Sequence, residues 1–459
     1  MLGTRAAAVG LSVQPDGLAL DQRARGCVPG SHLARPMLLT QTHDLHAGAA
    51  RVLALSTPIS DVVSFRASFA TGPDLGADDD VTQGLVADLL DKGTEARDRF
   101  AIAEDLEGRG ARLGFYSDGL RMGFAGRCLR ADLADVIGLA GEQIATPAFE
   151  PDEVRKAITK AVASVRRSMD STGARASGTM RRRLYPRDHP NYALYPADEI
   201  ARLEATTADD LRAYHRRHVA PAAPTVAVVG DLDPGGAAAA VAAAFGDRAD
   251  SVPPARFADT AAPDAPGRDL VEVADRPNLD VRIAHPVALR RDADDFLALY
   301  AAVFALGGNF SGHLMQTIRD EQGLTYGISA SIVDPSVHHD AHVQVSVTLS
   351  APDLERGIAA TRAEVARFVA DGLSEADLER TRTTLAGRHV VGLATTGGLA
   401  ARLIVNAERG FEIDYLDRYP DLVHALRLNA VNDALHRYVQ PEALHVVAAG
   451  TPAPEAVAE

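Results

Sequence analysis

The sequence predicts an α+β protein of two homologous domains, each an antiparallel-rich sheet covered by helices, joined by a proline-rich linker. Three observations support this prediction. Short segments of the two halves match one another in order. A stretch with four prolines separates these halves. Within each half, segments with a period of two residues are mixed with longer helical segments.

The first observation is an internal repeat with a spacing of about 213 to 224 residues. Each matching pair has one member in each half of the chain, and the pairs occur in the same order. They are "GARLGFYS" (110–117) with "GLTYGISA" (323–330), "FEPDEV" (149–154) with "LSEADL" (373–378), and "VAVVGD" (226–231) with "HVVAAG" (445–450). Each match is short, but three in one order indicate a duplication.

The second observation is the stretch "SVPPARFADTAAPDAPGRD", residues 251–269. It shows no apolar periodicity, and proline stiffens such a segment into an extended spacer. We therefore place the domain linker there. The remaining boundaries follow from it: an N-terminal extension over 1–48, a first domain over 49–250, and a second domain over 270–459.

The third observation concerns the elements themselves. Apolar and polar residues alternate over 62–69 and again over 342–350, which predicts half-buried antiparallel strands. Helices are expected over 353–371 and 374–388, and the second begins with the capping-box spacing of Ser374 and Asp377. We expect the helices to lie on one side of each sheet.

Composition excludes several classes of function. A net charge of −15 argues against a nucleic acid partner, because phosphate binding needs a concentrated basic face. The arginines at 166–167 and 181–183 are interpreted as solvated helix faces. No segment reaches the roughly 18 apolar residues that a membrane span requires. Two cysteines provide no disulfide framework and fit a reducing cytoplasm, while the N-terminal stretch leaves a periplasmic location open.

Four segments together resemble one family. They are "GLVADLLDKGT" (84–94), "LYPRDHPNY" (184–192), "VAVVGDLDP" (226–234) and "ALGGNFSGHLMQTIRDEQGLTYGISAS" (305–331). From about residue 50 to 450, the chain resembles the insulinase/pitrilysin family of zinc peptidases, in its bacterial and mitochondrial processing-peptidase branch. This resemblance implies peptide cleavage inside a closed chamber that is formed by two homologous halves.

The family's zinc helix typically reads H-x-x-E-H, followed a few residues later by K-G-T. Counting back from Lys92 places these positions on Gly84, Ala87 and Asp88. Two histidines four residues apart grip Zn²⁺ from one helix face, and the glutamate takes a proton from the metal-bound water. Here only Asp88 could touch a metal. The family's third ligand, a glutamate, is also missing, since residues 154–169 contain no acidic side chain. We therefore expect this chain to bind no zinc and to be inactive alone.

The second element implied by the resemblance is intact. Arg319 and Tyr326 match a pair that lies across the chamber from the zinc and contacts the substrate backbone near the scissile bond. An arginine offers forked donors to a peptide carbonyl, and a tyrosine hydroxyl can donate to a developing oxyanion. Outside this signature, the ordinary interpretation would be an Arg319 paired with Asp320 or Glu321 and a half-buried Tyr326.

Other candidates have structural interpretations. "HHDAH" (338–342) follows a turn signal and predicts a hairpin with exposed histidines, or an adventitious metal site. His215 and His218 share a helix but lack a third ligand, and His189 is expected in a loop. The Gly-rich "GGNFSGH" (307–313) lacks the ending of a phosphate-binding loop. It is expected to line the substrate chamber or to let a helix pack closely.

Three hypotheses follow. In the first, the chain is the non-zinc-binding subunit of a heterodimeric zinc peptidase. A homologous partner carries H-x-x-E-H and the zinc, and peptides are the substrates. In the second, it is a catalytically inert structural or peptide-binding homologue. In the third, it is an independent enzyme with another site, such as a metal on His338–His342.

Overall fold

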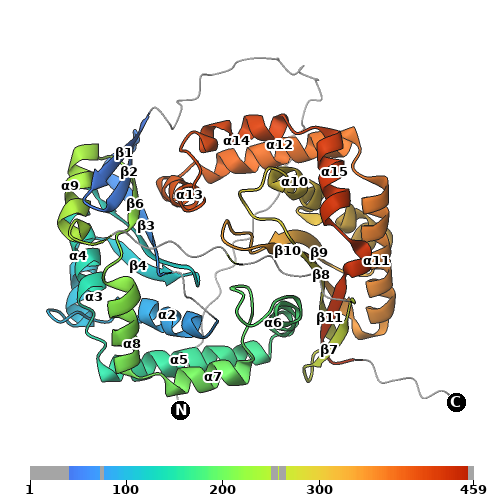
Figure 1. The fold of residues 1–459 in the computed structure, drawn as a ribbon, viewed down its shortest axis with the longest axis horizontal. Coiled ribbons are helices and arrows are strands. Elements are labelled where there is room, and N and C mark those ends of the chain that lie inside the picture. The colour runs from blue at the N-terminus through green and yellow to red at the C-terminus, as the bar shows by residue number, and fades with distance from the viewer. Residues whose placement is uncertain (1–40, 73–76, 250–256, 258–264, 453–459) are drawn as a thin grey trace, which may run out of the picture. The chain divides into compact units, whose positions relative to one another are not determined.

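A computed structural model of the chain describes residues 41–72, 77–249, 257 and 265–452. All of them belong to one compact unit that spans residues 37–459. The described strands form two sheets, each covered by helices (Figure 1). Most of the predicted N-terminal extension and most of the predicted linker lie outside the described residues. Strand β7 already begins at Arg268.

The first sheet has the strand order β1-β2-β6-β3-β5-β4. In this order the strands are Thr42–Ala47, Ala50–Ser56, Thr225–Gly230, Val62–Ala70, Arg121–Leu129 and Arg112–Ser117. The second sheet has the order β7-β11-β8-β10-β9. These strands are Arg268–Glu272, His445–Gly450, Asn278–Val287, Ala341–Ser350 and Ile328–Val333. Neighbouring strands are antiparallel except for β2 with β6 and β7 with β11.

Without β1, the two sheets have the same topology. β2-β6-β3-β5-β4 corresponds to β7-β11-β8-β10-β9, with the parallel pair at the same place in both. The matched segments 226–231 and 445–450 form β6 and β11. The match of 110–117 with 323–330 is displaced, because residues 323–327 precede β9. The predicted fold class is confirmed.

Helices follow the strands in both halves. The first half contains α2 (Ala77–Leu89), α3 (Arg99–Gly108), α4 (Leu133–Ala145), α5 (Pro151–Met169), α6 (Thr172–Leu184), α7 (Pro196–Ala205), α8 (Ala208–Tyr214) and α9 (Pro234–Phe245). The second contains α10 (Phe296–Gly307), α11 (Leu354–Asp371), α12 (Glu375–Gly392), α13 (Thr396–Glu408), α14 (Tyr415–His424) and α15 (Leu428–Tyr438). The capping box predicted at Ser374 and Asp377 opens α12.

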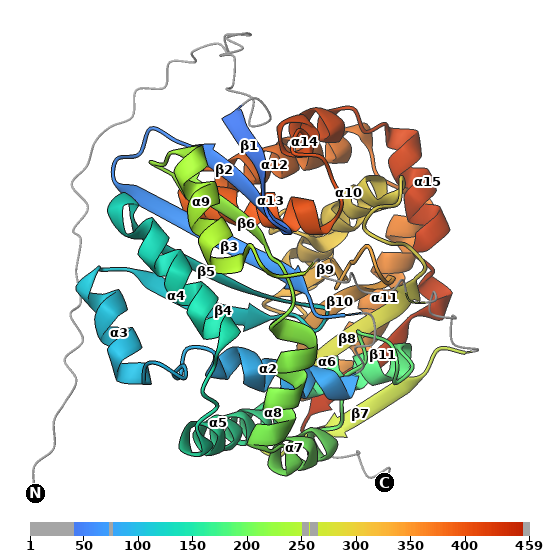
Figure 2. The same cartoon turned by 60° about the vertical axis from the view of Figure 1, so that its left-hand side comes forward.

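Each half sends one helix onto the sheet of the other half (Figures 1 and 2). α13 packs its buried Ala400, Leu403 and Ile404 against β2 and β6 of the first sheet. α6 packs Ala176 and Met180 against β8 and β11 of the second sheet. The expectation that helices lie on one side of each sheet is therefore wrong: α2, α4 and α9 cover the first sheet's other face.

This exchange corrects the prediction for β3. The alternating pattern predicted a half-buried strand, but Ser64 and Ser68 are buried as well as the apolar residues. The Ser64 hydroxyl lies 2.8 Å from the Thr396 hydroxyl at the start of α13. A helix from the other half therefore covers Ser64 on the polar face of β3, while the Ser68 hydroxyl accepts a hydrogen bond from Arg121 of β5 at 2.7 Å.

The arginine cluster 181–183 is likewise not a solvated face. Arg181 pairs with Asp334 at 3.3 Å, and Arg183 donates to Asp269 at 2.7 Å. Arg182 packs over the Tyr195 ring and donates to backbone carbonyls. The basic end of α6 thus anchors the helix between the halves. Among the described helices, no single one is long and apolar enough to cross a membrane, although the bent pair α12 and α13 passes by length and composition.

Candidate functional site

The predicted zinc-motif positions lie together on α2, on the side that faces α5. Ala87 is buried in the core of the first half, and Asp88 is exposed. A side chain at residue 84 would meet no atom within 4 Å. A Cβ therefore fits at Gly84, so steric crowding at that atom does not account for the absence of a metal-binding side chain.

The side chain that faces Asp88 is a cation. The Lys160 ammonium on α5 lies 3.6 Å from the Asp88 carboxylate. α5 is the helix in which the resemblance places the third, acidic ligand. Among the described residues, no three His, Cys, Asp or Glu side chains gather where they could hold a metal ion. One exposed carboxylate paired with a lysine does not fit a zinc ion, which needs at least three such donors.

The predicted Arg319 and Tyr326 lie in the second half, between α10 and β9. α10 ends at a Gly-rich turn, after which a π-helical segment, Met315–Glu321, carries Arg319. Tyr326 lies in the short connection to β9. At Gly307 a Cβ would lie 2.6 Å from the Ala330 backbone nitrogen, so only glycine allows this close approach. This contact supports the expectation that the turn lets the helix pack closely.

Tyr326 differs from its ordinary interpretation, whereas Arg319 keeps a long ion pair with Asp320. The nearest carboxylate contact of Arg319 is with Asp320, and the 3.9 Å distance is too long for a hydrogen bond. The guanidinium lies instead 4.7 Å from the centre of the Phe310 ring. Tyr326 is 97% exposed and Phe310 73% exposed. Two large rings held in solvent beside an arginine form a surface that is suited to contact another molecule.

A hollow of about 470 Å³ borders this surface. Its lining comes from the Gly-rich turn (Gly307–Phe310), from Tyr326–Ser329, and from strands β8 and β10, where Ser346–Thr348 contribute. β9 is an edge strand of the second sheet. Neither Arg319 nor any of Gly84, Ala87 and Asp88 lines the hollow, so the structure groups Tyr326, but not the zinc-motif positions, around it.

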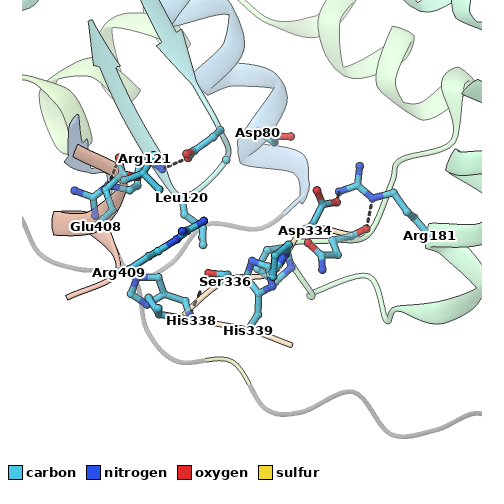
Figure 3. A pocket seen from close by; sticks show the side chains of 17 residues that line it. Asp80, Leu120, Arg121, Arg181, Asp334, Ser336, His338, His339, Glu408 and Arg409 are labelled. Carbon is cyan, nitrogen blue, oxygen red and sulfur yellow. Dashed lines mark hydrogen bonds and ion pairs between the residues drawn. The ribbon is translucent and has the colours of Figure 1, made fainter. Parts of the chain in front are cut away.

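A second hollow, of about 370 Å³, lies where the two halves meet (Figure 3). The β4–β5 turn, α6, the β9–β10 loop and the end of α13 contribute to it. Two ion pairs cross between segments on its wall: Arg121 with Glu408 at 3.5 Å and Arg181 with Asp334 at 3.3 Å. Sequence reasoning missed this hollow, because its charged residues come from segments far apart in the chain.

The histidines of residues 338–342, in the β9–β10 loop and at the start of β10, correct a prediction. His339 and His342 are buried, and Asp340 between them is fully buried. His189, expected in a loop, lies in a turn and is buried against Asp340, with 2.9 Å between its Nε2 and the carboxylate. The Tyr185 hydroxyl lies 2.9 Å from Nδ1 of His342. The predicted exposure was wrong because residues 185–191 cover this loop. His215 is buried and hydrogen-bonded to the Ile144 carbonyl, a structural role as predicted.

Comparison with known proteins finds a family similarity in the middle and second half of the chain. Residues 205–385 match the family described as "Peptidase M16 inactive domain". The matched part of the chain is therefore similar to the inactive domain of M16 peptidases. The match includes the stretch with Arg319 and Tyr326 and excludes residues 84–88. The resemblance to insulinase/pitrilysin zinc peptidases is confirmed.

Relatives of this chain include an uncharacterized zinc protease of Streptomyces coelicolor, 25% identical over 69% of both chains. Another, from Mycobacterium bovis, is 23% identical over 75% of this chain and 78% of its own. The fold matches the M16 inactive domain from Pseudomonas fluorescens with a TM-score of 0.80 at 22% identity, covering 91% and 99% of the chains. It also matches a ferredoxin protease solved with Arabidopsis ferredoxin, with a TM-score of 0.70 at 15% identity. This chain covers 49% of that protein.

Proposed function

We propose that this chain is the non-zinc-binding subunit of a heterodimeric zinc metallopeptidase. A homologous partner carries H-x-x-E-H, binds the zinc and activates the water. Arg319 and Tyr326 of this chain contact the substrate that is bound in the partner's active site. The substrates are peptides in extended conformation, held as an added strand on a sheet edge.

One combination of observations carries this proposal. The donor set for zinc is gone, with Lys160 paired to Asp88, while Arg319 and the 97% exposed Tyr326 remain on the surface beside a hollow. Because Tyr326 is almost fully exposed, burial in a core does not account for this side chain. An exposed tyrosine and an arginine, in a chain that lacks the zinc-binding side chains, are consistent with half of an active centre.

The size of related peptidases supports a two-subunit arrangement. This chain covers 49% of the ferredoxin protease and 49% of the periplasmic protease PqqL of Escherichia coli. Those proteins hold about twice this length in one polypeptide. In the proposed heterodimer, two chains of this length provide the equivalent of one such protein.

The first test is reconstitution with a homologue of similar length that carries H-x-x-E-H, sought in a neighbouring gene. Peptidase activity is measured for each chain alone and for the mixture, and zinc is measured in each sample. We expect activity only in the mixture and zinc only with the partner. Activity of this chain alone, removed by chelators, would overturn the proposal. An inactive mixture that nevertheless forms a stable complex would favour the inert homologue.

The second test concerns the pair itself. Tyr326→Phe and Arg319→Ala should each lower kcat of the mixture by on the order of 10²–10³, because an oxyanion-type donor is lost. Tyr195→Phe, at another exposed tyrosine, and Arg356→Ala, at an exposed ion-paired arginine, are matched controls that should leave kcat unchanged. Variants with an unchanged rate would refute the role of the pair without refuting the heterodimer.

A further inference from the structure

A third cavity, of about 230 Å³, lies within the second half between α10, α12, α13 and α14. Four arginines from three segments line it: Arg291 before α10, Arg388 of α12, and, from α13 and its C-terminal cap, Arg402 and Arg409. Tyr300, Tyr415 and Tyr419 line it too, and no aspartate or glutamate does. In a chain of net charge −15, such a basic cavity requires an explanation.

The guanidinium groups are not neutralised by the protein. Among the described residues, no carboxylate forms an ion pair with any of the four, whereas most of the arginines elsewhere on α12 and α14 are paired, as Arg418 is with Asp414 at 2.9 Å. Arg291 packs over the Phe296 ring at 4.2 Å, and Arg388 lies 5.4 Å from the Phe304 ring. Both rings leave the outward N–H donors available.

The arginines also repel one another. Burial, together with the charges of Arg291 and Arg402, lowers the pKa of Arg409 to about 10, although Tyr415 and Glu408 act in the opposite direction. Like charges gathered in a partly buried place cost free energy of folding unless a counter-charge is bound. The structure contains this cost without showing what offsets it.

We propose that this cavity binds a small multivalent oxyanion, a phosphate- or carboxylate-bearing metabolite. Guanidinium forks match the geometry of phosphate and carboxylate oxygens, and tyrosine hydroxyls add donors. The volume is below the roughly 300–1,000 Å³ of sites for drug-sized ligands, which fits a compact ion. Several positive charges without a carboxylate favour a ligand with two or more negative charges.

The position of the cavity gives binding a structural consequence. α13 is the helix that the second half packs on the first sheet, and Arg409, at its end, also lines the hollow between the halves (Figure 3). An anion that joins α13 to α10, α12 and α14 would therefore hold this exchanged helix in place.

The test is calorimetric titration of the full chain with pyrophosphate and, separately, citrate, against potassium chloride at the same ionic strength. We expect binding of at least one of the two anions and none of chloride. Arg409→Gln should weaken the affinity at least about tenfold, since a charge-assisted hydrogen-bond pair is lost. Without anion, its melting temperature should equal or exceed that of the native chain, because repulsion is relieved.

Arg402→Gln provides a second variant with the same expectation, so that a folding defect at one position does not decide the outcome. Arg418→Gln, on α14 but ion-paired outside the cavity, is the matched control and should retain full affinity. A preference for pyrophosphate or for citrate identifies the ligand class. The proposal would be overturned if the Arg409 and Arg402 variants bound the anion as tightly as the native chain does. It would also be overturned if the native chain bound neither anion more strongly than chloride.

Discussion

At the residue scale, the zinc-motif positions could be interpreted from sequence alone, whereas the histidines could not. Gly84 and Ala87 lack donor atoms wherever they lie, so their inability to bind metal is a property of the side chains. The environment of His339 and His342 depends on residues 185–191, which are distant in the chain. Spacing within "HHDAH" carries no information about that cover.

The buried histidines lead to a prediction about pH. Burial lowers the pKa of His339 and of His342 to about 4, against an ordinary value near 6.5. Between these values the unfolded chain binds protons that the folded chain does not. The stability is therefore fully present above about pH 6.5 and is lost as the pH falls toward 4.

His342→Gln should make this pH dependence shallower, by at most about 1.4 kcal/mol per pH unit, the equivalent of one proton. Chemical denaturation between pH 4.5 and 7.5 measures it. His436→Gln, at an exposed position on α15, should leave the slope unchanged. An unaltered slope in His342→Gln would show that this histidine does not titrate differently in the two states.

At the scale of elements, periodicity predicted the strands and helices but not all their surroundings. α12 begins with the predicted capping box because Ser374 and Asp377 interact locally. β3 was expected to be half-buried and is buried on both faces, because α13 arrives from more than 300 residues away in sequence. Local patterns record which face is more apolar, not whether a distant helix covers the other.

The exchanged helix yields a prediction of its own. Ile404 on α13 is fully buried against the first sheet. Ile404→Ala should lower the free energy of unfolding by about 2–5 kcal/mol through lost packing and a cavity. Hydrogen exchange should quicken in β2 and β6, although the substitution lies in the other half. Val391→Ala, at a position 74% exposed, should change stability by less than about 0.5 kcal/mol. Quickened exchange confined to the second half would contradict this coupling.

At the scale of the whole molecule, the duplication was readable from sequence, and both sheets confirm it. The sequence did not show whether the two halves fold independently. Each half leaves one sheet face to a helix of the other: Leu53, Leu55 and Val229 need α13, while Ala284 and Val447 need α6. The halves therefore complete one another's cores.

This dependence predicts how fragments behave. Residues 41–249 and 265–452, expressed separately, should each remain aggregated or unfolded, because an apolar sheet face and an apolar helix face are exposed. Coexpression should give a soluble complex of both pieces. Circular dichroism and size-exclusion chromatography measure these outcomes. A cooperative thermal transition in either fragment alone would show that the halves fold independently.

The zinc-motif positions and the role of the Arg319 and Tyr326 pair come from a resemblance and stay predictions. The sequence by itself determined the duplicated α+β fold and which side chains stand at Gly84, Ala87, Asp88, Arg319 and Tyr326. These depend on residue identity and on periodicity over short stretches. Only the tertiary structure decided the exchange of α6 and α13, the burial of the β9–β10 histidines, and the gathering of Arg291, Arg388, Arg402 and Arg409 around one cavity. The physical reason is that burial and charge clustering depend on segments that meet only when the chain folds.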